Sequence, residues 1–436
     1  MSYRLILQNC ASGRPVLEGL ASGVAQNGGL TPDEAALLGQ ACGEVFSFLC
    51  QGAEEIELEW VFRGHASFAE AQLWLPARPR AWQALQACQL SGLLREFSRE
   101  RLLPAADLQP GQTSLMRAAR AVEQVNLRAQ DRRVGLCLRK DRYYPELDPP
   151  RWPAPPPQEV LRIDQPTPAG LQDFCSFLPD RHWGAPIFLR HPQRVSDLMA
   201  SDGLCGVLAY GLQDRCLGGM FWWPKGRNIR GYGPYLMEGQ SKLVAEQLLD
   251  ACLRASARTA AYGLSILEPT LDLPVGQFER LGSYTLRDKT GRHEVPAYFR
   301  QLHEDPGGAA WCPEFLEDWL RQEYDRLELG REIRPLPTES TAPSPLSAFS
   351  TELQAGRLIL QPIHPGDDST ECLERYVKAA LEAGVVNIFV TLDLGQPWQG
   401  ALAQVLRNLH FKPCFLRPAG GENLDLLIWQ YESADA

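Results

Sequence analysis

Hydrophobic and polar positions follow two periods along the chain, and together these predict a series of helices and strands. Thr31-Pro32-Asp33-Glu34 is typical of a helix start, since the threonine can cap, the proline fits the first position and the glutamate completes a capping box. The mostly apolar residues 35–50 that follow predict a buried helix. Residues 54–62 and 68–75 alternate between polar and apolar, which predicts two antiparallel strands.

The same two patterns continue along the rest of the chain. A glycine-led helix is expected over 111–125 and a strand over 134–138. The apolar runs 205–210 and 216–223 flank a short polar turn and predict a hairpin, and a long helix is expected over 242–256. We therefore expect the α/β class, of the α+β kind, with a sandwich at the N-terminus followed by mixed sheets.

Two proline-rich segments divide the chain. The segment 148–157 reads as a stiff extended linker, because proline neither continues a helix nor donates to a central strand. The segment 334–350 mixes proline with serine and threonine and is expected to be an exposed tether. Three domains result, and their expected bounds are 1–147, 158–330 and 351–436.

The order of elements in the first domain resembles the GHKL ATPase fold, particularly its small anti-sigma-factor kinases. In that family the first helix carries a Glu followed four residues later by an Asn that holds magnesium. Here Glu44 matches the Glu, but Phe48 stands at the Asn position and offers no oxygen to a hard cation. The family's adenine-reading Asp-x-Gly-x-Gly loop is replaced by Pro76-Ala77-Arg78-Pro79. We expect a degenerate domain that is kept as a binding scaffold and does not hydrolyse ATP, so that ATP is not an expected cofactor. Glu44 is expected to be a satisfied helix residue.

The second domain resembles the GNAT acetyltransferases. Its predicted hairpin matches strands two and three of that fold, and 278–286 looks like the helix, glycine and strand near the fold's end. GNAT enzymes cradle the pyrophosphate of coenzyme A on backbone N–H groups at the start of a central helix, where unpaired donors and the helix dipole favour anions. They also splay two strands to admit the acyl group. The resemblance implies a pocket wall at Tyr232-Gly233-Pro234-Tyr235.

The GNAT phosphate motif, Gln/Arg-x-x-Gly-x-Gly/Ala, matches only in part. The corresponding stretch is Gln240-Ser241-Lys242-Leu243-Val244-Ala245, in which Gln240 and Ala245 fit while Leu243 replaces the first glycine. A side chain there can obstruct the phosphates or demand another backbone shape. Coenzyme A or acetyl-CoA binding and a degraded fold with an ordinary capped helix both remain open. No catalytic residue is assigned, and Tyr284 falls on the strand side of Gly282.

The third domain repeats the order strand, helix, strand, helix, strand and looks like a second GNAT-type half. The expected strands are 357–361, 385–392, 411–417 and 424–431, and the expected helices 370–383 and 399–409. Its phosphate-loop position, 366–371, contains three carboxylates, which would repel a pyrophosphate. We expect no cofactor here, and a half that completes or mirrors the sheet of the second domain.

Composition narrows the range of partners. The 436 residues carry a formal charge of −10, which argues against a general nucleic-acid or anionic-membrane binder. No run of about 18 apolar residues predicts a membrane span, and the N-terminus lacks a signal-peptide pattern. Seven single histidines and twelve scattered cysteines have no zinc spacing, so we expect no metal site and a reducing, cytoplasmic setting.

Two functions are therefore carried forward. The first is a non-catalytic regulatory or scaffold protein that binds a protein partner, because each recognisable catalytic motif lacks a residue that its chemistry requires. The alternative is an acyl-CoA-dependent N-acyltransferase that uses the second domain. Leu243 is the residue that discriminates between them.

Overall fold

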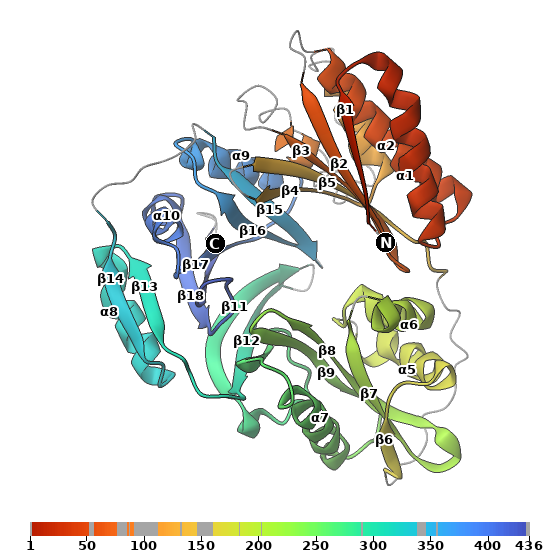
Figure 1. The fold of residues 1–436 in the computed structure, drawn as a ribbon. Helices are drawn as coiled ribbons and strands as arrows, with labels where there is room; N and C mark the ends of the chain where they lie inside the picture. The colour runs from red at the N-terminus through yellow and green to blue at the C-terminus, as the bar shows by residue number, and fades with distance from the viewer. Residues whose placement is uncertain are drawn as a thin grey trace. The chain divides into compact units, whose positions relative to one another are not determined.

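The computed structural model contains both helices and strands and is an α+β protein (Figure 1). The structure describes residues 2–51, 56–75, 85–86, 88–90, 112–130, 133–145, 160–182, 184–201, 203–288, 291–337, 346–354 and 356–432. Within these ranges, no helix is both long and apolar enough to cross a membrane. The stretch Pro76–Pro79 and the proline-rich linker 148–157 lie outside the described residues.

The chain forms two compact units, each built from two separate stretches of sequence. Unit 1 comprises Met1–Tyr143 and Glu339–Val390, and unit 2 comprises Tyr144–Thr338 and Thr391–Ala436. The first two boundaries lie close to or inside the proline-rich segments. The third boundary lies within a single strand inside the expected domain 351–436, so that this stretch contributes to both units.

The N-terminal part of unit 1 is a five-stranded antiparallel sheet covered by helices (Figure 1). The strand order is β1-β2-β3-β5-β4, with β1 at Ser2–Gln8, β2 at Glu57–Gly64, β3 at Phe68–Leu75, β4 at Gln124–Gln130 and β5 at Arg133–Asp141. The helices are α1 (Arg14–Asn27), α2 (Pro32–Cys50) and α4 (Gln112–Ala121). Leu58, Trp60 and Phe62 alternate along β2 and are fully buried in the core that the helices share with the sheet.

Local sequence signals account for most of these elements. The capping box of α2 is present: Thr31 Oγ1 accepts from the N–H of Glu34 at 3.3 Å, and Glu34 Oε2 accepts from the N–H of Thr31 at 2.8 Å. The expected strand pair is confirmed as β2 and β3. The helix expected over 111–125 is wrong at its end, because Gln124–Gln130 is β4, in which Val125 and Leu127 are buried at every second position.

The later stretch of unit 1 contains β15 (Ala348–Gln354), β16 (Arg357–His364) and α9 (Ser369–Glu382), and β16 runs parallel to the start of β17 (Asn387–Asp393). The exposed tether expected over 334–350 is wrong at both ends. Arg334 lies in β14 (Arg331–Pro335), and residues 346–349 are buried where β15 begins. The apolar side chains of Leu346, Ala348 and Phe349 explain this burial, and residues 338–345 lie outside the described part.

Unit 2 is built on a seven-stranded sheet with the order β11-β12-β10-β9-β8-β7-β6. The strands are β6 (Arg162–Asp164), β7 (Cys205–Tyr210), β8 (Cys216–Lys225), β9 (Asn228–Leu236), β10 (Gly263–Ile266), β11 (Glu279–Asp288) and β12 (Gly291–Gln301). Only β9 and β10 pair in parallel within this sheet, and the other neighbours are antiparallel. The expected hairpin is confirmed as β7 and β8.

Helices cover both faces of this sheet. Helices α5 (Pro168–Arg181) and α6 (Pro192–Ser201) share one core with residues such as Phe174 and Phe221. Helix α7 (Lys242–Ser256) packs through Val244 and Leu248 in a second core, together with Met220 and Trp222. Phe221 and Trp222 are neighbours on β8 that enter opposite cores, as the alternation of a strand buried on both faces requires.

Unit 2 also contains a parallel pair and a C-terminal hairpin. The strands β13 (Gly308–Cys312) and β14 are joined by α8 (Glu314–Arg326). Helix α10 (Pro397–Asn408) precedes the antiparallel strands β18 (Phe411–Arg417) and β19 (Leu426–Tyr431). The side-chain amide of Gln430 accepts from the N–H of Thr285 on β11 at 2.9 Å and donates to its carbonyl at 2.5 Å. The C-terminal hairpin therefore belongs with the body formed by residues 144–338.

Candidate functional site

The stretch that corresponds to the GNAT phosphate motif, residues 240–245, leads into α7. Ser241 is the N-cap residue, and the helix begins at Lys242. The side chain of Leu243 is 59% exposed, whereas Val244 and Ala245 are buried in the core beneath the helix. The N–H of Gln240 donates to the carbonyl of Met237 at 3.3 Å. The leucine that replaces the expected glycine therefore projects into solvent at the first turn.

The predicted pocket wall forms a bulge on β9. Tyr232 pairs with Phe221 and Tyr235 with Gly219, so that Gly233 and Pro234 together face a single residue of β8. Gly233 has φ of +98°, a conformation that glycine adopts without strain. Both tyrosines point into the core under α5 and α6 and are at most 6% exposed. Their rings serve the core packing of unit 2.

Strands β9 and β10 pair over only three residues. Their parallel register runs only from Gly263 opposite Asn228 to Ser265 opposite Arg230. Strand β9 continues to Leu236 without β10 beside it, while β10 ends at Ile266. The part of β9 that extends beyond this pairing therefore includes the bulge at Gly233 and Pro234.

The chain that follows β10, residues 267–273, is bonded to this part of β9 and is called the strap here. Thr270 Oγ1 donates to the carbonyl of Pro234 at 2.6 Å, and Asp272 Oδ2 accepts from the N–H of Leu236 at 3.2 Å. On the other side, the hydroxyl of Tyr284 on β11 donates to the carbonyl of Leu267 at 2.9 Å. The strap is thus bonded both to β9 and to β11.

Asp272 also connects the strap to the end of α5. Its carboxylate is 3.2 Å from Arg181 Nη2 and 3.7 Å from His182 Nε2, and its side chain is 10% exposed. His182 Nε2 lies 3.0 Å from the carbonyl of Leu236. Because a carbonyl oxygen can only accept, Nε2 carries the proton in the neutral ring, and Nδ1 is left with the basic lone pair.

Burial lowers the pKa of His182, and the carbonyl of Leu236 and the carboxylate of Asp272 oppose that effect only in part. A neutral imidazole with a fixed tautomer is the arrangement that a general base needs. Sequence reasoning missed this residue. Its only local signal is a histidine directly after a helix, and the two partners lie 54 and 90 positions further along the chain.

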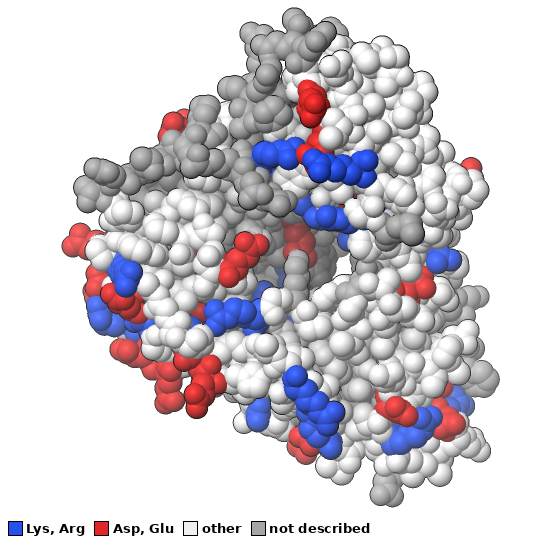
Figure 2. Space-filling view, in the orientation of Figure 1, with Lys and Arg blue, Asp and Glu red and all other residues white. Residues whose placement is uncertain are grey.

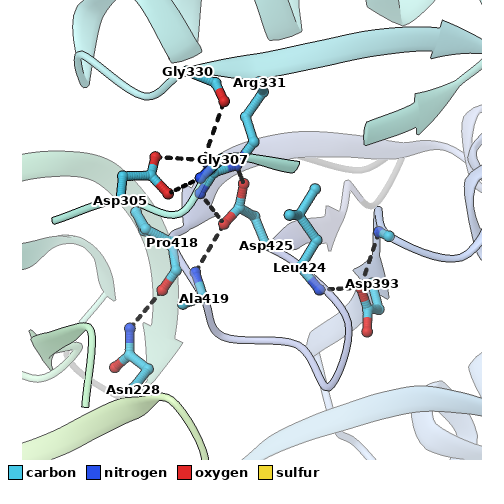
Figure 3. Close-up of polar contacts among 11 residues, drawn as sticks. Asn228, Asp305, Gly307, Gly330, Arg331, Asp393, Pro418, Ala419, Leu424 and Asp425 are labelled. Carbon is cyan, nitrogen blue, oxygen red and sulfur yellow. Dashed lines mark hydrogen bonds and ion pairs between the residues drawn. The ribbon is translucent and has the colours of Figure 1, made fainter. Parts of the chain in front are cut away.

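A second polar cluster in unit 2 surrounds Arg331 (Figure 3). Arg331 Nε and Nη2 donate to the two carboxylate oxygens of Asp425 at 2.7 and 3.1 Å, and Nη1 is paired with Asp305. The side chains of Arg331 and Asp425 are 2% and 0% exposed. Burial alone would lower the pKa of Arg331, but the bonds to Asp425 and Asp305 raise it above its ordinary value.

The surroundings of this cluster identify it as a structural anchor. Asp425 Oδ1 also accepts from the N–H of Ala419 at 2.8 Å, and Asn228 Nδ2 donates to the carbonyl of Pro418 at 2.6 Å (Figure 3). Asp393 accepts from the N–H groups of Leu424 and Asn423 at 3.1 and 2.9 Å. These bonds fix the loop between β18 and β19 against the body of unit 2.

A hollow of about 270 Å³ lies close to this anchor. Arg227, Tyr262, His303 and Glu304 are among the residues that line it. His303 Nε2 is 2.9 Å from the carbonyl of Thr259, so this ring is oriented by the backbone. Because the charged lining residues have opposite signs and are exposed, the hollow selects no particular ligand charge.

The ATPase candidates in unit 1 lie between α1 and α2. Glu44 is buried, and its carboxylate is 3.3 Å from Arg14 Nη2, while Arg14 also donates to Glu18 and Ser47 at 2.7 Å each. Phe48 packs against the hydrophobic core. Over the described ranges of both units, no group of three His, Cys, Asp or Glu residues could hold a metal ion.

Comparison with known proteins adds no family to this picture. No protein-family model and no curated protein matches this chain.

Proposed function

We propose that this chain is a non-catalytic regulatory or scaffold protein that binds a protein partner, and that unit 2 is a GNAT-like body whose acyl route is occupied by its own chain. The strap carries this proposal. In the GNAT resemblance, the acyl group enters a gap where two strands splay. Here Thr270 and Asp272 hold the chain after β10 against β9 at the place where that gap would be. The parallel pairing of β9 and β10 over three residues, with α7 between them in sequence, supports the resemblance.

Displacing the strap has an energetic cost. An acyl group in the gap would have to break the bond from Thr270 to Pro234 and leave the carboxylate of Asp272 without the N–H of Leu236. Each net hydrogen bond contributes about 1 kcal/mol, and a charged acceptor contributes more. At the other end of the site, the exposed side chain of Leu243 stands where the resemblance places a phosphate-contacting glycine.

In the same proposal, unit 1 is a degenerate GHKL-like domain that is kept for binding a partner. Arg14 neutralises the one carboxylate that matches the family pattern. On the face shown in Figure 2, Lys and Arg lie interspersed with Asp and Glu and form no broad basic area among the described residues. Together with the formal charge of −10, this supports a protein partner in preference to nucleic acid. The twelve cysteines are all free, which supports a reducing, cytoplasmic setting.

We expect neither acetyl-CoA nor Mg-ATP to raise the melting temperature of the full chain. A ligand that binds only the folded state stabilises it by about 2.7 kcal/mol at a hundredfold excess over its dissociation constant, which thermal-shift titration detects readily. Free coenzyme A serves as the matched ligand control for acetyl-CoA. A saturable rise with acetyl-CoA would overturn the proposal for unit 2, and a magnesium-dependent rise with ATP would overturn it for unit 1.

The alternative function is acyl-CoA-dependent N-acyl transfer, and His182 is the observation that favours it. Its Nδ1 lone pair could accept the proton that an attacking amine loses, with Nε2 held by Leu236 and Asp272. This function requires the strap to leave the gap. Acetyl transfer to a set of primary amines that His182→Ala abolishes, without a change in melting temperature, would favour the enzyme over the scaffold.

Leu243→Gly tests the obstruction at the start of α7. Glycine near the helix start costs up to about 1 kcal/mol of stability, while the phosphate approach is opened. We expect calorimetry to show weak or absent acetyl-CoA binding by the native chain and tighter binding by the variant. Leu161→Gly is the matched control, because that leucine is also 59% exposed in unit 2 but lies next to β6, outside α7 and the strap. Tight binding by the native chain that Leu243→Gly removes would contradict the obstruction.

A further inference from the structure

The twelve cysteines of this chain are not equivalent, and Cys10 differs from the rest. Cys10 is exposed to solvent, whereas the other eleven cysteines are half-buried or buried. It lies in unit 1 between β1 and α1, and its thiol sulfur is 3.1 Å from the hydroxyl oxygen of Ser12. An oxidant or alkylating reagent in solution therefore reaches this thiol before any other.

The surroundings of Cys10 also favour its thiolate. The hydrogen bond from Ser12 lowers the pKa of Cys10, with smaller contributions from nearby backbone N–H groups. Burial raises the pKa of each of the other eleven thiols. Because the thiolate is the reacting form, exposure and ionisation select the same residue.

A second thiol lies near Cys10 at the end of α2. Asn9 Nδ2 donates to the carbonyl of Leu49 at 3.2 Å, which fixes the residue before Cys10 to the residue before Cys50. Asn9 also exchanges bonds with Ile56: its Oδ1 accepts from the Ile56 N–H at 2.8 Å, and its own N–H donates to the Ile56 carbonyl at 3.1 Å. Burial raises the pKa of Cys50, and the negative charge of Cys10 adds to that rise.

We propose that Cys10 is an oxidant-reactive modification site and that Cys50 is its resolving thiol, with a hydroperoxide as the oxidant. The Cys10 thiolate attacks the peroxide oxygen, the O–O bond breaks, and Cys10 becomes a sulfenic acid while the leaving oxygen takes a proton. The Cys50 sulfur then attacks the sulfenic sulfur, displacing water and forming a disulfide. The peroxide is reduced by two electrons, which the two thiols supply. The product joins the start of α1 to the end of α2.

The test uses the full chain, briefly treated with hydrogen peroxide, alkylated and mapped by mass spectrometry without reduction. We expect a Cys10–Cys50 linked peptide that thiol reductant removes. In Cys50→Ser, we expect the sulfenic acid of Cys10 to be trapped by dimedone. Cys205→Ser is the matched control, because Cys205 is also half-buried but lies in unit 2, and it should leave the linkage unchanged.

The labelling rate gives a second readout that does not need the disulfide. Ser12 is itself exposed, and Ser12→Ala removes its hydrogen bond to the thiol of Cys10. We therefore expect slower iodoacetamide labelling of Cys10 at neutral pH. A pKa rise of one unit lowers the thiolate fraction up to about tenfold. Labelling of Cys10 no faster than that of Cys205, or peroxide treatment that leaves Cys10 and Cys50 unlinked, would overturn the proposal.

Discussion

Replacing Arg331 with alanine is expected to lower the free energy of unfolding of unit 2 by about 3–5 kcal/mol. The substitution removes the cation that pairs with both carboxylates, of which Asp425 is fully buried and Asp305 is 13% exposed. Two like charges in a poorly hydrated site destabilise the fold more than the lost pair itself contributed. The loop between β18 and β19 should loosen first, because Asp425 also accepts from the N–H of Ala419.

Two compact units need not unfold in one transition, so a single unfolding curve would not report on unit 2 alone. Hydrogen exchange on the full chain instead locates the loss of stability strand by strand. We expect faster exchange in β13, β14 and β19. Arg321→Ala is the matched control, because its pair with Glu317 is exposed and such i,i+4 pairs contribute only about 0.3–0.5 kcal/mol. Equal exchange in the two variants would show that the buried cluster is not an anchor.

Elements with local signals could be predicted from the sequence. The capping box at Thr31 and the alternation that buries Trp60 and Phe62 are properties of neighbouring residues, so helix α2 and strand β2 were predictable. The same holds for all six elements expected over 351–436, which correspond to β16, α9, β17, α10, β18 and β19. Strand β15 was missed because prolines and serines just before it suggested a tether.

The division into units depends on contacts that no local pattern carries. The boundary at Val390 and Thr391 falls inside β17, a strand that is buried at all but one position and whose sequence gives no sign of a break. Arg331 and Asp425 are 94 positions apart, and neither differs in type from the exposed charges around it. Buried partners of this kind are recognised only once the topology has placed them together.

The candidate site shows the same limit. The pocket wall at Tyr232–Tyr235 and the start of α7 were placed by resemblance, and the structure puts them on one strand and on the helix that follows it. The strap was not predicted, because Thr270 and Asp272 become significant only through β9. His182 was missed for the same reason, since its tautomer is set by Leu236 and Asp272.

Replacing Gln89 with leucine is expected to destabilise unit 1 by about 3 kcal/mol or more. Gln89 is fully buried, and its Nε2 donates to the carbonyl of Phe349 and to Thr351 Oγ1 at 3.1 Å each and to Asn126 Oδ1 at 3.0 Å. Its Oε1 accepts from the hydroxyl of Tyr376 at 2.5 Å. Leucine fills a similar volume but leaves several of these groups buried without a partner. Each such group lowers the free energy of unfolding by about 1–3 kcal/mol.

The Gln89→Leu variant shows whether the polar network around Gln89 stabilises unit 1 or contributes nothing to its stability. Asn126 adds to the network by donating to the carbonyl of Thr351 at 3.0 Å and accepting from its N–H at 2.9 Å, as a neighbouring strand would. We expect Gln89→Leu to increase hydrogen exchange in β15 and β4. Gln26→Leu is the matched control, because Gln26 is exposed on α1 and its change should stay within about 0.5 kcal/mol. If Gln89→Leu exchanges no faster in β15 than this control, apolar packing alone holds residues 346–354 on the N-terminal sheet.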